Sequence, residues 1–158
     1  MSSRHGRNTL AAAAAAIVAL AALPAMAAGD AVYHTQHMKL EPVGGAPLRS
    51  GFVQNIKANG PTIYAHEVYV LNGAAPRATY TITNNFFFED PTCDDPSSNF
   101  ATDTAQLRTN RAGNARADIF VVPADVTGFE GVHGVMWTIQ NAAGEVVYQT
   151  GCSRVTLD

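Results

Sequence analysis

The sequence predicts an all-β protein: an Ig-like antiparallel β-sandwich of about 8–9 short strands preceded by a cleaved signal peptide, with a small β-barrel as the alternative. Three observations predict this class. Apolar residues recur with a period of two, turns rich in Gly and Asn separate them, and no window has the pattern of a capped amphipathic helix. The single tryptophan, Trp137, stands at the centre of an alternating segment, so we expect it in the core.

Residues 1–27 have the features of a secretory signal peptide. Arginines give a positive start, a run of about 14 apolar residues follows, and small residues precede an expected cleavage site after Ala27. An uncleaved anchor is the alternative, but a membrane span needs roughly 20 apolar residues. We therefore expect a single mature domain of residues 28–158 that is secreted or periplasmic and has no membrane span.

Strands are expected wherever alternating or β-branched segments lie between turn signals. The expected strands are 32–40, 51–56, 62–71, 79–83, 105–109, 117–121, 135–139, 146–150 and 155–157. Residues 110–114 and 141–144 are predicted to be hairpin loops. Residues 123–126 are expected to form at most a single helical turn. Residues 84–104 are left as one long connection, and connections of that length are usually functional or disordered.

Cys93 and Cys152 are the only cysteines. An even pair in an exported chain predicts a disulfide. The bond closes a loop of about 60 residues, for which chain entropy gives roughly 4 kcal/mol of stabilisation. A zinc tetrad would need nearby histidines, and a redox pair would need a C-x-x-C spacing, so both alternatives are disfavoured. A bridge would also hold the long connection near the last strands.

The charge balance argues against nucleic acid as a partner. The full chain has 10 basic and 13 acidic side chains; cleavage removes Arg4 and Arg7, which leaves 8 and 13 and a net charge near −5. Nucleic acid and anionic membrane surfaces both require clustered Lys and Arg, whereas the basic residues here are scattered.

An acidic group in the long connection is a candidate calcium site. Asp90, Asp94 and Asp95 offer oxygen ligands of the kind that Ca²⁺ prefers. Their spacing does not follow an EF-hand series, and aspartates in such a loop also cap turns.

A histidine group near the mature N-terminus is a second candidate metal site. His34, His37 and Met38 provide imidazole and thioether ligands that suit copper or zinc. In a strand, however, residues three apart point to opposite faces, which disfavours one shared ion.

The aromatic run Phe86, Phe87 and Phe88 is a candidate binding surface. Three consecutive rings on a strand cannot all face one core, so at least one should point away from it. An exposed ring would suit a protein or glycan partner. The alternative is that the loop folds back and buries the run.

No catalytic motif is present, and no cofactor is expected. The sequence lacks a G-x-S-x-G elbow, an H-E-x-x-H helix and a glycine-rich phosphate loop. Glu67, Glu89 and Asp90 are the only weak candidates for paired carboxylates of a hydrolase. We therefore expect an exported, non-enzymatic binding or structural module, with a metal-binding protein or a small secreted hydrolase as alternatives.

Overall fold

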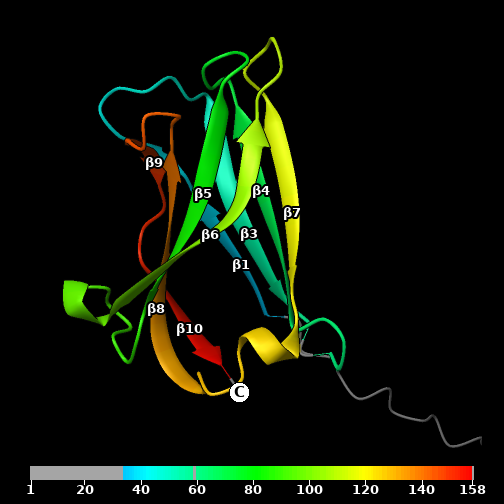
Figure 1. Cartoon of the computed structure of the whole chain (residues 1–158), viewed down its shortest axis with the longest axis vertical. Helices are drawn as coiled ribbons and strands as arrows, with labels where there is room; N and C mark the ends of the chain where they lie inside the picture. Colours follow the sequence, from blue (N-terminus) through cyan, green and yellow to red (C-terminus); the bar gives the residue numbers. More distant parts are fainter. Residues whose placement is uncertain (1–33, 59, 158) are drawn as a thin grey trace, which may run out of the picture. The chain divides into compact units, whose positions relative to one another are not determined.

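The computed structural model describes residues 34–58 and 60–157. The predicted signal peptide, residues 1–27, lies outside these residues. Every regular element described, apart from two short 3₁₀ turns, is a strand (Figure 1). Within this part of the chain, no helix has the length and apolar character needed to cross a membrane.

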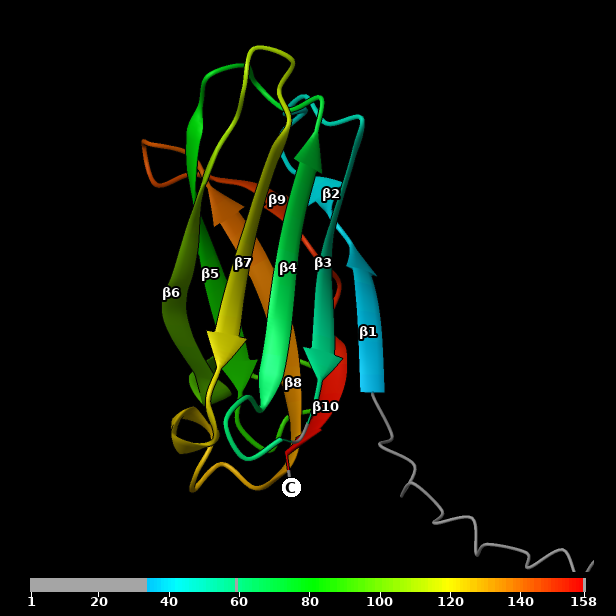
Figure 2. The ribbon, with the colours of Figure 1, turned by 90° about the vertical axis from the view of Figure 1, so that its right-hand side faces the viewer.

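The first sheet contains four antiparallel strands in the order β1-β3-β4-β7. Their bounds are β1 His34–Lys39, β3 Ser50–Lys57, β4 Ala65–Asn72 and β7 Ala115–Val121. Figure 2 looks onto this sheet, with the second sheet behind it. Alternate residues of β4 and β7 face the second sheet, as the period of two in the sequence predicts.

The second sheet has the order β2-β9-β8-β5-β6, and β10 pairs with the first half of β8 while β9 pairs with its second half. The bounds are β2 Glu41–Pro42, β5 Thr79–Phe87, β6 Asn99–Arg108, β8 Gly131–Gln140, β9 Val146–Gln149 and β10 Ser153–Leu157. The two antiparallel sheets face each other and do not close into a barrel, so the sandwich prediction is confirmed at this level and the barrel alternative is wrong.

The connection at 110–114 is not the predicted hairpin loop. The strands on either side of it belong to different sheets, because β6 pairs with β5 and β7 pairs with β4. The five residues therefore carry the chain from one sheet to the other. Gly113 has a φ of 75°, and its Cα lies close against the carbonyl of Ala74. By contrast, residues 141–144 do join a hairpin, between β8 and β9.

The long connection is shorter than predicted. Residues 84–87 extend β5 and residues 99–104 begin β6, so that only 88–98 lies outside strands. The first part of β6 is exposed at nearly every position and therefore lacks the alternation by which strands were found. The predicted helical turn at 123–126 is observed as η2, Pro123–Asp125, and η1 covers Pro96–Ser98.

The predicted disulfide is present. Cys93 and Cys152 are bonded with their Cα atoms 5.9 Å apart and 59 residues apart in sequence. The bond joins loop 88–98 to the start of β10, and it packs against Gly134 of β8. A Cβ on Gly134 would lie 2.6 Å from the sulfur of Cys93, so this close approach requires glycine.

Large apolar side chains fill one half of the space between the sheets. Trp137 is fully buried, as predicted, and lies at the boundary of this half. Among the described residues, the other fully buried large apolar side chains are Leu40, Val53, Tyr69, Leu71, Ile82, Leu107, Ile139 and Tyr148. Beyond Trp137, some inward positions carry small or polar residues, among them Asn55, Ala65 and Thr102, and the space between the sheets is only partly filled there.

Candidate functional site

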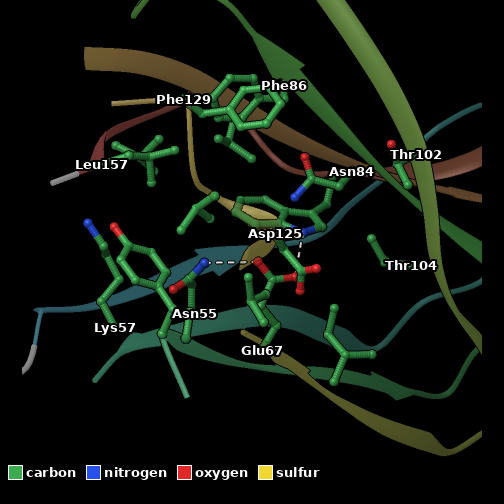
Figure 3. Close-up of a pocket in the computed structure, with 18 of the residues that line it drawn as sticks. Asn55, Lys57, Glu67, Asn84, Phe86, Thr102, Thr104, Asp125, Phe129 and Leu157 are labelled. Carbon is green, nitrogen blue, oxygen red and sulfur yellow. Dashed lines mark hydrogen bonds between the residues drawn. The ribbon is translucent and has the colours of Figure 1, made fainter. Parts of the chain in front are cut away.

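A cavity of about 490 Å³ occupies the half of the sandwich that the apolar core leaves unfilled (Figure 3). Strands β3, β4 and β7 form one wall, and β5, β6, β8 and β10 form the other. Residues of the segment that includes η2 complete the lining. This volume lies within the range of about 300–1,000 Å³ that is typical of ligand sites.

Most of the lining is apolar and much of it is aromatic. The apolar lining residues are Ala65, Phe86, Phe100, Ile119, Phe120, Val121, Val126, Phe129, Val135, Trp137, Val155 and Leu157. Phe86 and Phe129 meet edge to face with ring centroids 6.0 Å apart, and Figure 3 shows them together on one side of the cavity. Aromatic and aliphatic walls of this kind favour an apolar ligand.

The opening lies beside the two edge strands β6 and β7. Phe100 of β6 and Phe120 of β7 both belong to the lining, and each is 59% exposed. Because these strands belong to different sheets and do not pair, side chains alone separate the interior from solvent here. The Phe100 ring therefore borders the entrance, whereas the Phe120 ring stacks on His66 with centroids 4.6 Å apart, on the outer face of the first sheet.

Glu67 lies at the inner end of the cavity and is only 3% exposed. Its Oε2 accepts hydrogen bonds from the Tyr69 hydroxyl and from Trp137 Nε1, the latter at 3.2 Å. Its Oε1 accepts a bond from Asn55 Nδ2 at 2.9 Å. Figure 3 shows the Asn55 amide and the Glu67 carboxyl facing each other. Tyr69 is in turn held by Thr104, whose Oγ1 lies 3.1 Å from the hydroxyl.

Burial raises the pKa of Glu67, against the opposing effect of the hydrogen bonds from Tyr69, Trp137 and Asn55. Desolvation disfavours the charged carboxylate, whereas bonds donated to it favour that form. Burial also raises the pKa of Tyr69, and the neighbouring Glu67 adds to the rise. The inner end of the cavity is thus a polar network in an apolar setting.

Sequence reasoning named Glu67 only as a weak hydrolase candidate. The position of Glu67 in the strand was the one sequence signal for its role. Glu67 shares the inward face of β4 with Tyr69 and Leu71, so its carboxyl group must point into the space between the sheets. Glu89 and Asp90, named with it, lie in loop 88–98 and do not line the cavity. The second carboxyl of the lining, Asp125, accepts the backbone N–H of Val122.

The acidic calcium candidates lie in loop 88–98 and cap its turns. The Asp90 carboxylate accepts hydrogen bonds from the backbone N–H and hydroxyl of Thr92 and from the backbone N–H of Asp95. The Asp95 carboxylate accepts hydrogen bonds from the backbone N–H and hydroxyl of Ser97. These bonds lower the pKa of Asp90 and of Asp95. Asp94 is exposed.

The histidine candidates lie on β1, in the first sheet. The ring of His37 packs on Phe52 with centroids 4.5 Å apart, whereas Met38 packs against the core. Because neighbouring strand residues alternate, these two side chains leave the strand on opposite sides. His34 begins the strand. Among the described residues, no group of three or more His, Cys, Asp or Glu side chains is placed to hold a metal ion.

The aromatic run divides between two faces. Phe86 lines the cavity, Phe87 is buried, and Phe88 is 39% exposed. Phe86 and Phe88 pack around the ring of His133, which is buried and accepts the backbone N–H of Glu89 through Nδ1. One ring thus points outward, and Phe86 contributes to an internal surface that the sequence did not predict.

Comparison of the chain with models of known protein families, with curated protein sequences and with solved structures gives no match.

Proposed function

We propose that this chain is an exported, non-enzymatic binding protein whose ligand is a small molecule held between the two sheets. The observation that carries the proposal is the cavity itself: about 490 Å³ lined by aromatic and aliphatic side chains around one buried, hydrogen-bonded carboxyl. Few polar groups among apolar walls are the usual composition of a ligand site.

The arrangement at Glu67 supports binding rather than hydrolysis. Both carboxyl oxygens already accept bonds from protein donors, and the only other carboxyl of the described lining caps η2. A glycosidase would need two carboxyl groups that face a shared substrate across the site. Glu67 acts instead as a fixed acceptor that orients Asn55 and Trp137 at the inner wall.

Export and the Ig-like subclass belong to the same proposal. The pattern of residues 1–27 supports secretion to the periplasm or beyond, and the Cys93–Cys152 disulfide fits an oxidising compartment. Two antiparallel sheets joined by a crossing connection at 110–114 are features that an Ig-like sandwich would share.

A fluorescent probe tests the binding proposal. N-phenyl-1-naphthylamine is uncharged, emits strongly only in apolar surroundings and absorbs where tryptophan emits. Trp137 is the single tryptophan and lines the cavity, so energy transfer from it reports a probe bound there. We expect saturable binding of one probe per chain with transfer from Trp137.

Two substitutions make this test specific to the cavity. Ile119→Phe adds volume to the lining and should weaken probe binding, whereas Gln106→Phe adds the same ring at an exposed position outside the lining and should leave binding unchanged. Circular dichroism checks that both variants fold. The proposed function is refuted if the folded wild type binds neither this probe nor smaller apolar ring compounds in a saturable manner.

A further inference from the structure

Two buried polar atoms on the wall of the cavity have no hydrogen-bond partner among the described residues: Asn55 Oδ1 and the Tyr64 hydroxyl. Tyr64 is 6% exposed, and both residues line the cavity. A buried polar group left unpaired costs about 1–3 kcal/mol, so such groups usually meet a partner. Here the cavity is the side from which a partner can come.

The charged groups of the described lining already face protein atoms. Lys57 Nζ donates to the carbonyl of Thr156 and lies 5.2 Å from the centre of the Tyr64 ring. Asp125 accepts a hydrogen bond from the backbone N–H of Val122. Glu67 accepts hydrogen bonds from the side chains of Asn55, Tyr69 and Trp137. No cation is therefore directed inward to receive an anionic ligand, and an anion would also lie close to Glu67.

A cationic ligand is disfavoured for a different reason. An ammonium group would need the Glu67 carboxylate as its counter-ion, but both oxygens are engaged and the carboxyl is shielded behind Asn55 and Trp137. Burial raises the pKa of Glu67, which further weakens it as a partner for a cation.

We propose that the ligand is an uncharged ring compound, aromatic or alicyclic, with a hydroxyl or N–H group that donates to Asn55 Oδ1 and pairs with the Tyr64 hydroxyl. This inference rests on the proposed function and adds the chemical class of the ligand. The ring body packs among Phe86, Phe129 and Trp137, and the polar group meets the unpaired atoms of Asn55, on β3, and of Tyr64, which directly precedes β4. A hydroxyl satisfies both, since it donates and accepts at once.

A series with one skeleton and four substituents tests the class. The compounds are 2-naphthol, 2-methylnaphthalene, 2-naphthoate and 2-naphthylmethylammonium, each titrated into the intact mature protein by calorimetry at neutral pH. We expect 2-naphthol to bind about tenfold more tightly than 2-methylnaphthalene, because a paired hydroxyl is worth about one hydrogen bond. The two ions should bind more weakly than 2-naphthol by at least the same factor.

Tyr64→Phe provides the matched variant, because it removes one hydroxyl and keeps the ring beside Lys57. We expect it to weaken 2-naphthol binding by about threefold to tenfold and to leave 2-methylnaphthalene binding unchanged. Equal weakening of both compounds would indicate a general change of shape and would overturn the assignment of the hydroxyl.

The outcomes separate this inference from the proposed function. Binding of 2-methylnaphthalene as tightly as 2-naphthol, or preference for either ion, would overturn the ligand class while leaving the cavity a binding site. If neither the naphthalene series nor the fluorescent probe binds the folded protein, the proposed function itself fails.

Discussion

Two substitutions of Glu67 test the polar network at the inner end of the cavity. Glu67→Leu removes the acceptor and keeps an apolar side chain of similar size. Glu67→Gln keeps an oxygen that can accept from Tyr69 and Trp137, and its amide can donate to Asn55 Oδ1 once the Asn55 amide turns over. The pair therefore separates hydrogen bonding from volume.

The magnitude follows from the donors that Glu67→Leu leaves unpaired. Trp137 Nε1 is fully buried and loses its bond, whereas the Tyr69 hydroxyl keeps Thr104 as a partner. Asn55 is only half-buried beside the cavity, where water can replace Glu67. One buried donor is thus left unsatisfied, at a cost of about 1–3 kcal/mol, so we expect Glu67→Leu to lower the free energy of unfolding by about 1–3 kcal/mol. Glu67→Gln should stay within about 1 kcal/mol of the wild type at neutral pH.

The pH dependence of stability gives the same network a second signature. Burial raises the pKa of Glu67 above its ordinary value of 4.5, so the folded state holds this proton more tightly than the unfolded state. The corresponding stabilisation is complete below pH 4.5 and is lost as pH rises through the folded pKa. The pKa values of Asp90, Asp95 and Asp118 are lowered in the folded state. Their contribution to folding stability is therefore lost only as pH falls below 3.8, the ordinary pKa of an aspartate.

Urea unfolding followed by far-ultraviolet circular dichroism between pH 4 and 8 measures both effects. Above pH 4.5 the wild type should lose stability as pH rises, while Glu67→Gln should show a flatter profile, because its side chain cannot ionise. The reasoning is refuted if Glu67→Gln is as unstable as Glu67→Leu, or if its profile runs parallel to that of the wild type.

Three further predictions concern the scaffold and export. Replacing both Cys93 and Cys152 by Ala should lower the free energy of unfolding by about 4 kcal/mol, because the disulfide restricts the unfolded chain between residues that are 59 apart in sequence. A loss of less than about 1 kcal/mol, measured by urea unfolding, would contradict this prediction. Gly113→Ala places a Cβ 2.0 Å from the carbonyl oxygen of Ala74 and should lower the free energy of unfolding by more than about 2 kcal/mol. Gly144→Ala has a similar φ but open space around the new Cβ, so it should lower the free energy of unfolding by only about 1 kcal/mol. Equal losses of stability in the two variants would rule out the clash at Gly113. N-terminal sequencing of the exported protein should begin at Ala28, and an intact leader would argue against cleavage.

The strands that the sequence predicted have apolar residues at alternate positions. β7 alternates between half-buried and exposed positions because one side packs on the core, whereas β8 is buried at most positions, including the predicted inward residues Val135, Trp137 and Ile139. The disulfide was predictable because the leader sequence assigns an oxidising compartment to a chain with one pair of cysteines. In both cases the decisive information is local or compositional.

The features that sequence reasoning missed depend on pairing across long distances. A five-residue turn after β6 is compatible with a hairpin or with a crossing to the other sheet, and only the partners β4 and β5 decide between them. The early part of β6 is an exposed edge and carries no alternating pattern. The cavity is lined by residues of both sheets and of the segment that includes η2, so no single segment contains its signal.

The indole N–H of Trp137 provides the most direct test of the account. Because Trp137 is the only tryptophan, a ¹H–¹⁵N correlation spectrum contains a single indole N–H cross-peak. This N–H lies at the cavity wall and donates a hydrogen bond to Glu67. We predict that 2-naphthol moves this cross-peak in a saturable manner and that Ile119→Phe weakens the response. If 2-naphthol binds while the cross-peak stays in place, the ligand lies elsewhere and the central claim is contradicted.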